Sequence, residues 1–171
     1  MEEYLKRARE IIDDYEEALD LLDGYDHQRV EKPEGREEGS RLSYEECRAI
    51  IDNMSYGSSS ALFGNEKDDS FKGSIGDIYQ TFAGVDVYPT VEEKAANLLY
   101  FIVKNHSFSD GNKRIAAVVF LYFLDKNSLL YDEKGKKKVD DGALVSLTIM
   151  LACSRPQDKE IMINLVMNFI K

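Results

Sequence analysis

The sequence predicts an all-α protein with one small β-hairpin, and three features indicate this fold class. Apolar residues recur at spacings of three and four along several segments, as they do on the buried faces of amphipathic helices. Ser43 and Thr90 are each followed three residues later by Glu, the arrangement that caps helix starts. Two short β-favouring pieces, residues 75–82 and 85–88, predict a hairpin.

The first predicted helix covers residues 2–23 and ends at Gly24. Its apolar stripe has near-heptad spacing, so it either packs on the chain's own domain or pairs with a second copy to form a homodimer. Residues 24–41 are polar and contain Gly and Pro, which predicts a linker or a long surface loop. We therefore expect an N-terminal helix and linker over residues 1–41 and one main domain over residues 42–171.

The main domain contains the remaining predicted helices. The capping patterns start one helix over about 43–54 and another after Thr90, whose buried face carries Ala95, Leu98, Leu99 and Ile102. A helix that includes Ile115 and Phe123 is apolar on more than one side, which predicts a central position. Two further helices are expected over about 140–153 and 156–170.

Composition excludes several classes of protein. No stretch approaches the roughly 18 apolar residues of a membrane span, and the N-terminus is charged throughout, unlike a secretory signal, so we expect no membrane partner and a cytoplasmic protein. The formal net charge of −10 opposes a broad nucleic-acid surface, so we expect this domain to bind no nucleic acid. The basic run at 134–138 contains Gly135 and is predicted to be a solvated turn.

The string HSFSDGNKR, residues 106–114, places a dense polar cluster at the start of the central helix. A helix start leaves backbone N–H groups unpaired and carries a partial positive charge, so it can hold an anion. Gly111 and Asn112 can adopt the backbone angles that aim successive N–H groups at one point. Lys113 and Arg114 oppose the helix dipole but would complement a polyphosphate.

Asp110 and His106 add acid–base and metal chemistry to this cluster. Beside phosphates, Asp110 could hold Mg²⁺, which commonly takes one or two carboxylates and completes its coordination with phosphate oxygens and water. His106 could accept a proton from an attacking hydroxyl. Each residue alone has an ordinary structural role, such as a helix cap or a surface charge. Their combination within nine residues indicates a nucleotide-phosphate site.

HSFSDGNKR resembles the signature of the Fic/Doc (Fido) family: His, any residue, Phe, any residue, an acid, Gly, Asn, Gly or Lys, and Arg. The resemblance extends from about residue 42 to the end. The strings ALFGNEKDDSF and EKAANLLYFIVKNHSFSDGNKRIAA are similar to the Fic domain associated with RhuM-type virulence proteins. The resemblance implies a Fic-type helical bundle with a β-hairpin flap shortly before the motif.

The resemblance also implies roles for individual residues. His106 would deprotonate a Ser, Thr or Tyr hydroxyl of a target protein, and Asp110 would bind Mg²⁺. Gly111, Asn112 and Lys113 would form the phosphate nest, and Arg114 would contact the phosphates of ATP. The flap would dock the target's backbone as an added strand, a role that falls on Ile78, Tyr79 and Gln80.

Two positions depart from the adenylylating members of the family. These members carry a second Arg where this chain has Ala117, and Gly where it has Lys113. Doc-type members share the Lys, lack that Arg and are understood to transfer the γ-phosphate of ATP. Gly111 and the length of the predicted flap instead resemble Fic enzymes that transfer AMP. We predict AMP transfer (AMPylation), with Doc-like γ-phosphate transfer as the alternative.

Two non-enzymatic readings remain: a catalytically idle Fic-fold binding module of a larger regulator, and a helical DNA-associated domain, which the acidic charge disfavours. Many family members also carry an inhibitory helix in which Ser or Thr is followed four residues later by Glu. No Ser or Thr of this sequence has Glu at that spacing. We therefore expect control by a separate antitoxin-like partner or by an upstream domain.

Overall fold

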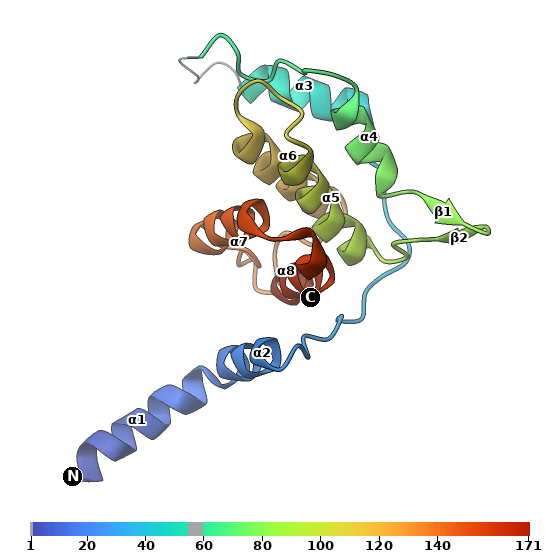
Figure 1. The fold of residues 1–171 in the computed structure, drawn as a ribbon. Coiled ribbons are helices and arrows are strands. Elements are labelled where there is room, and N and C mark those ends of the chain that lie inside the picture. The colour runs from blue at the N-terminus through green and yellow to red at the C-terminus, as the bar shows by residue number, and fades with distance from the viewer. Residues whose placement is uncertain (1, 55–59) are drawn as a thin grey trace. The chain divides into compact units, whose positions relative to one another are not determined.

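The computed structural model describes residues 2–54 and 60–171, and the chain divides into two compact units, residues 1–32 and 33–171. Across the described residues the structure contains α-helices and one two-stranded antiparallel sheet, which confirms the predicted fold class (Figure 1). None of the helices in these ranges has the length and hydrophobicity that a bilayer crossing requires.

The first unit contains two helices, α1 (Glu2–Asp14) and α2 (Glu16–Asp26). The single helix predicted for residues 2–23 is therefore interrupted at Tyr15, and it continues beyond Gly24. Neither helix contains a buried side chain. The apolar stripe of these helices is exposed. Whether it packs on the chain's own domain or on a second copy stays a prediction.

The second unit contains the remaining elements, and their order follows the predicted helices with one addition, α4. They are α3 (Tyr44–Met54), α4 (Ser70–Asp77), β1 (Thr81–Phe82), β2 (Val85–Asp86), α5 (Val91–Asn105), α6 (Asn112–Lys126), α7 (Asp141–Cys153), a short 3₁₀ helix (Pro156–Asp158) and α8 (Lys159–Ile170).

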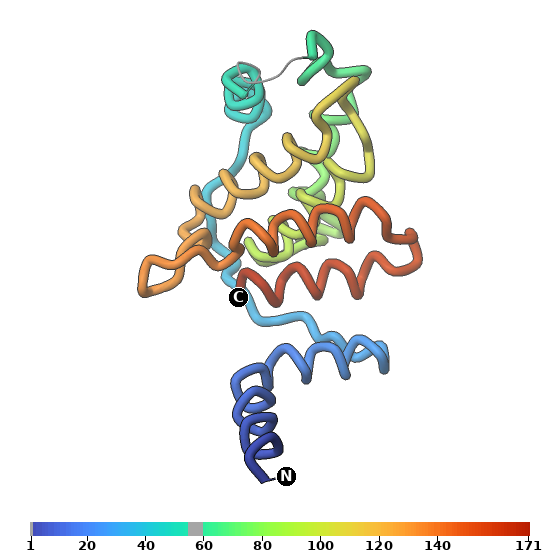
Figure 2. The backbone as a smooth tube through the Cα atoms, turned by 90° about the vertical axis from the view of Figure 1, so that its left-hand side faces the viewer, coloured from blue at the N-terminus to red at the C-terminus, as the bar shows by residue number. Residues whose placement is uncertain are grey.

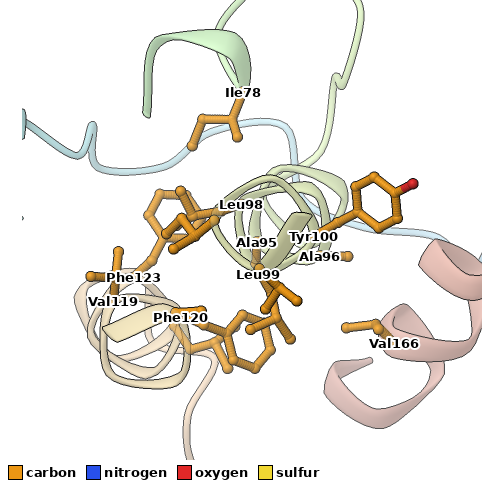
Figure 3. Packing of buried hydrophobic residues seen from close by; sticks show 14 of the residues in the cluster. Ile78, Ala95, Ala96, Leu98, Leu99, Tyr100, Val119, Phe120, Phe123 and Val166 are labelled. Carbon is orange, nitrogen blue, oxygen red and sulfur yellow. The ribbon is translucent and has the colours of Figure 1, made fainter. Parts of the chain in front are cut away.

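Helix α5 is the centre of the core and packs against α4, α6, α7 and α8. Figure 3 shows Leu98 directed toward Phe123 of α6, and Val166 of α8 on the other side of α5. The predicted buried face of α5 is confirmed, because its four predicted apolar residues are fully buried. Apolar burial of this extent stabilises α5 and α6 as a pair. The HSFSDGNKR motif lies at the connection between these two helices.

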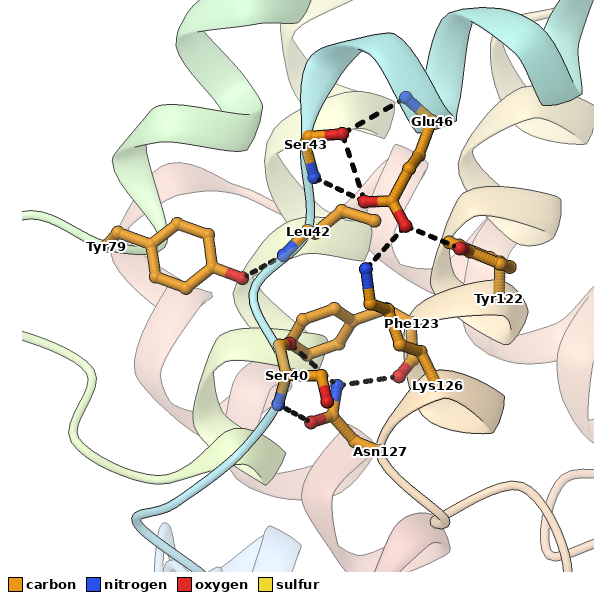
Figure 4. A network of polar contacts seen from close by, with 9 residues as sticks. All are labelled: Ser40, Leu42, Ser43, Glu46, Tyr79, Tyr122, Phe123, Lys126 and Asn127. Carbon is orange, nitrogen blue, oxygen red and sulfur yellow. Dashed lines mark hydrogen bonds and ion pairs between the residues drawn. The ribbon is translucent and has the colours of Figure 1, made fainter.

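Both predicted capping boxes form the expected helix starts. The Ser43 N–H donates to Glu46 Oε2 at 2.9 Å, and the Glu46 N–H donates to Ser43 Oγ at 3.2 Å (Figure 4). The Thr90 hydroxyl oxygen accepts from the Glu93 N–H at 3.1 Å. Each cap satisfies an N–H group that the helix leaves unpaired.

Glu46 also ties α3 to α6. Its Oε1 accepts from Lys126 Nζ at 2.5 Å and from the Tyr122 hydroxyl at 2.7 Å (Figure 4). These hydrogen bonds, with Lys126 the strongest, lower the pKa of Glu46 from its ordinary value of 4.5 to about 2. The ionised carboxylate is thus the form that the fold stabilises.

Residues 33–41, predicted as part of a linker, belong to the second unit. The Val91 N–H donates to the Arg36 carbonyl at 2.7 Å. The Ser40 N–H donates to Asn127 Oδ1 at 2.7 Å, as Figure 4 shows. Hydrogen bonds from its backbone thus join this polar segment to the start of α5 and the end of α6. Such pairing leaves little trace in hydrophobic periodicity, which explains the linker prediction.

The prediction of a first strand over residues 75–82 is wrong for the first half of this range. Residues 70–77 form α4, and the strand is limited to Thr81–Phe82, which pairs with Val85–Asp86. Phe71, Ile75 and Ile78 are buried at spacings of four and three, the period of a helix. Two β-branched residues at this spacing gave the strand-like composition.

Residues 127–140 form an extended loop between α6 and α7 (Figure 2). Tyr131 bridges to Lys137, and Gly135 takes a positive φ of 79° at the tip. The backbone N–H groups of Lys134 and Lys136 both donate to Asp132 Oδ1, and all of these lysines are exposed. Residues 134–137 of the basic run therefore form a solvated turn, as predicted, whereas Lys138 is half-buried and donates to the Ile170 carbonyl at 3.3 Å.

Candidate active site

The motif between α5 and α6 lines a single cavity of about 260 Å³. The cavity brings together every motif residue for which a role was predicted, and it adds Ser109. The lining residues are His106, Ser109, Asp110, Gly111, Asn112, Lys113 and Arg114. The cavity is somewhat smaller than most ligand pockets, but it has the few converging polar groups that orient a bound ligand.

His106 ends α5 in the left-handed backbone conformation, with φ 49° and ψ 52°. This conformation is uncommon outside glycine and ends the helix by turning the chain away from its axis. The imidazole is exposed, and its Nδ1 lies 3.1 Å from the Nζ of Lys67. His106 is thus placed at the cavity, beside a cation that the sequence had not indicated.

Gly111 is required by the geometry of the turn that begins α6. Its φ is 90°, and a Cβ at this position would lie 2.3 Å from the ring of Phe63. The first hydrogen bond of the helix runs from the Ile115 N–H to the Gly111 carbonyl at 2.9 Å. Within the described part of the chain, no hydrogen bond is donated by the backbone N–H groups of residues 112–114. These groups lie where the sequence predicted a phosphate cradle, and that role stays a prediction.

Asn112 contributes to the site through its backbone, because its side chain is already bonded. Its Oδ1 accepts from the Phe108 N–H at 2.9 Å, and its Nδ2 donates to the Phe108 carbonyl at 2.8 Å. Phe108 itself is fully buried and packs edge-on against Phe71, with ring centroids 4.8 Å apart. This pair of hydrogen bonds holds the loop in one shape around the cavity.

The charged groups of the motif lie close to one another. Arg114 stacks over the Phe63 ring at 4.6 Å, and its Nη2 lies 3.7 Å from Asp110 Oδ2. Lys113 is exposed beside them. Among the described residues, no group of three or more His, Cys, Asp or Glu side chains could hold a metal by itself. A single carboxylate at a phosphate cradle instead fits Mg²⁺, which shares its coordination between protein, phosphate and water.

The loop of residues 60–69 lies beside the motif, and the sequence analysis did not predict this contact. The Gly64 N–H donates to the Asp110 carbonyl at 3.1 Å, and the Ser109 N–H donates to the Asn65 carbonyl at 2.9 Å. A third bond joins the Lys67 N–H to the Ser107 carbonyl at 2.9 Å. This loop is thus paired along its backbone with the motif, about forty residues further along the chain.

Side chains from α3 anchor the loop of residues 60–69. Glu66 accepts from the Tyr44 hydroxyl at 2.5 Å and from Arg48 Nη1 at 3.1 Å. Arg48 also donates to the Gly64 carbonyl at 2.8 Å. A carboxylate that receives two side-chain donors, one of them cationic, is a strong local anchor. The loop of residues 60–69 is therefore held in place by α3 as well as by the motif.

The hairpin that was predicted to dock a target lies away from the motif. The hairpin precedes α5 and the motif follows it, and the 15 residues of α5 span about 22 Å (Figure 1). Ile78 is fully buried, and the Tyr79 hydroxyl accepts from the Leu42 N–H at 2.7 Å, so both face the interior. Gln80 is exposed. The docking prediction for these three residues is therefore corrected: the segment beside His106 is the loop of residues 60–69.

Unpaired N–H groups at a helix start, a neighbouring carboxylate and an imidazole thus lie together at one cavity. The Fic/DOC family model matches residues 41–124, which contain this whole site. Residues 41–124 of the chain are therefore similar to the Fic/DOC family.

A curated relative is Toxin Doc of Mycolicibacterium smegmatis (strain ATCC 700084 / mc(2)155), which is 45% identical over 49 residues. The aligned stretch covers 29% of this chain and 38% of the toxin, so it spans well under half of the relative's length. No solved structure gives a significant match to the chain.

Proposed function

We propose that this chain transfers a phosphorus-containing group from ATP to a Ser, Thr or Tyr hydroxyl of a target protein. One observation carries the proposal: His106, Asp110 and the unpaired N–H groups at the start of α6 meet at one cavity. The match of residues 41–124 to the Fic/DOC family model supports the same class of chemistry. A relative whose name is Toxin Doc adds support for a toxin-like role.

Each residue has a defined part in this proposal. The N–H groups of residues 112–114, with Lys113 and Arg114, would hold the phosphates of ATP. Asp110 would hold Mg²⁺, which when bound neutralises charge on the phosphates. His106 would take the proton of the target hydroxyl as its oxygen forms a bond to phosphorus. The bond from phosphorus to its leaving group breaks in the same reaction.

The leaving group distinguishes the two versions of this reaction. Transfer of AMP releases pyrophosphate, and transfer of the γ-phosphate releases ADP. The prediction of AMP rested partly on the hairpin as the flap, and the hairpin lies at the far end of α5. Ala117 stands where the adenylylating members carry a second Arg, Lys113 matches the Doc pattern, and a relative is named Toxin Doc. These observations favour the γ-phosphate, and AMP becomes the second candidate.

The test uses ATP labelled at either the α or the γ position, with Mg²⁺ and a cell lysate as the source of targets. We expect the γ label to appear on protein and the α label to be absent. The chain has two histidines, so His27→Ala in the first unit is a matched control for His106→Ala. Label should be lost in His106→Ala and retained in His27→Ala.

Three results would change the proposal. Transfer of the α label would establish AMP as the group moved. Retained transfer in His106→Ala would remove the imidazole from the mechanism. Nucleotide binding without label on any protein would support the idle binding module instead.

A further inference from the structure

We propose that Lys67 is a positioning residue that restrains His106, because its ammonium occupies the only nitrogen with which the neutral imidazole can accept a proton. The inference rests on the proposed function, since it concerns the same imidazole. It assigns a role to a residue outside the motif, in the loop of residues 60–69 that lies beside it.

The contact defines which ring nitrogen carries the proton. Lys67 Nζ lies 3.1 Å from His106 Nδ1. An ammonium has three N–H donors and no acceptor, so Nδ1 must be the acceptor in this hydrogen bond. A neutral imidazole has one accepting nitrogen, and the other carries the proton. His106 is therefore held with its proton on Nε2.

This arrangement is the reverse of the usual orientation of a histidine base. A base of this kind commonly donates Nδ1–H to a carbonyl or carboxylate, which leaves Nε2 free to accept. Within the described residues, the hydrogen bond to Lys67 is the only one that the His106 ring makes. No carbonyl or carboxylate in this part of the chain holds the ring in the accepting orientation.

Both routes to a working base require Lys67 to leave. If the substrate proton goes to Nδ1, the ammonium occupies the position that the hydroxyl needs. If it goes to Nε2, the ring must first carry a proton on Nδ1, which would then point at the donors of Lys67. Transfer is therefore slower than it would be without this contact, whichever nitrogen accepts.

The backbone keeps Lys67 beside His106. The Lys67 N–H donates to the carbonyl of Ser107, the residue after His106, at 2.9 Å. The preceding Glu66 is anchored by Tyr44 and Arg48. The Lys67 side chain is nevertheless exposed, so the ammonium can move aside without disturbing the loop. A restraint of this kind slows the reaction without preventing it.

The first test measures transfer kinetics with Lys67→Met, which keeps the length of the side chain and removes its donors. We expect kcat to rise about three- to tenfold, the range that one net hydrogen bond of this kind represents, with KM for ATP unchanged. Lys67→Arg keeps the donors and should stay close to wild type. Lys134→Met makes the same change at an exposed lysine of the 127–140 loop and should change neither constant.

The second test reads the ring directly by ¹⁵N NMR of histidine-labelled protein without nucleotide. The two histidines give separable ring signals, and His27→Gln assigns them. At alkaline pH we expect Nδ1 to have the shift of an unprotonated, hydrogen-bonded nitrogen. Lys67→Met should move this signal toward the value of a free nitrogen, and Lys134→Met should not.

The outcomes separate this inference from the proposed function. An unchanged or lower kcat in Lys67→Met overturns the restraint, and a raised KM would make Lys67 a phosphate ligand instead. If wild type transfers nothing, the proposed function fails and the NMR result decides alone. An Nδ1 signal that is protonated, or that does not respond to Lys67→Met, overturns the inference.

Discussion

Replacing Gly111 with Ala tests whether the start of α6 is built against the loop of residues 60–69. The backbone there has φ 90°, and left-handed backbone costs a residue with a side chain roughly 1–2 kcal/mol. The new Cβ would also lie 2.3 Å from Phe63 Cε2, and relieving such overpacking costs about 1–3 kcal/mol more. We therefore expect Gly111→Ala to lower the free energy of unfolding by about 2–5 kcal/mol.

Gly135→Ala is the matched control for this prediction. Gly135 has φ 79°, and nothing lies within 4 Å of the position that its Cβ would take, so it incurs only the backbone term. Urea unfolding of both variants, with similar m-values, isolates the contact with Phe63. Equal losses in the two variants would show that Phe63 does not pack on the motif. Adding Phe63→Ala to Gly111→Ala should recover part of the difference, because the two changes share one contact.

Two further predictions concern side chains that hold the fold around the site. Glu46→Gln should lower stability by about 1–2 kcal/mol at neutral pH. Because the pKa of Glu46 is depressed, its contribution to stability is present above about pH 4.5 and is lost as the pH falls toward about 2. Urea titrations across this pH range should show little effect of the control Glu45→Gln, whose side chain is exposed. Asn112→Ala removes both hydrogen bonds to Phe108 and should lower the free energy of unfolding by about 1–3 kcal/mol. The exposed control Asn53→Ala should change it by less than about 0.5 kcal/mol. An equally small change in Asn112→Ala would mean that the two hydrogen bonds do not hold the loop.

Local patterns were sufficient to predict the helices that build the core. The period of apolar residues gave α5 and α6, and the Ser43 and Thr90 boxes gave helix starts that the structure confirms. The unpaired N–H groups of the motif also follow from local rules, since any helix start has them. These features depend on residues within one or two turns of each other, so they can be read from the chain directly.

The features that were missed depend on contacts between distant segments. The loop of residues 60–69 has no hydrophobic period, and it is ordered by backbone bonds to Ser107, Ser109 and Asp110. Tyr15 interrupts the first helix without a Gly or Pro to mark the break. Helix α4 is eight residues long, too short for its period to outweigh its β-branched composition. Lys67 became visible as part of the site when the fold placed it beside His106.

The most direct test of the central claim is an NMR titration of ¹⁵N-labelled protein with ATP and Mg²⁺, followed at the backbone amides. A triphosphate seated at the start of α6 should shift the amide signals of residues 112–114 more than any others, because its oxygens accept from those N–H groups. Unchanged signals at these three residues with millimolar ATP, or larger shifts centred elsewhere, would contradict the account.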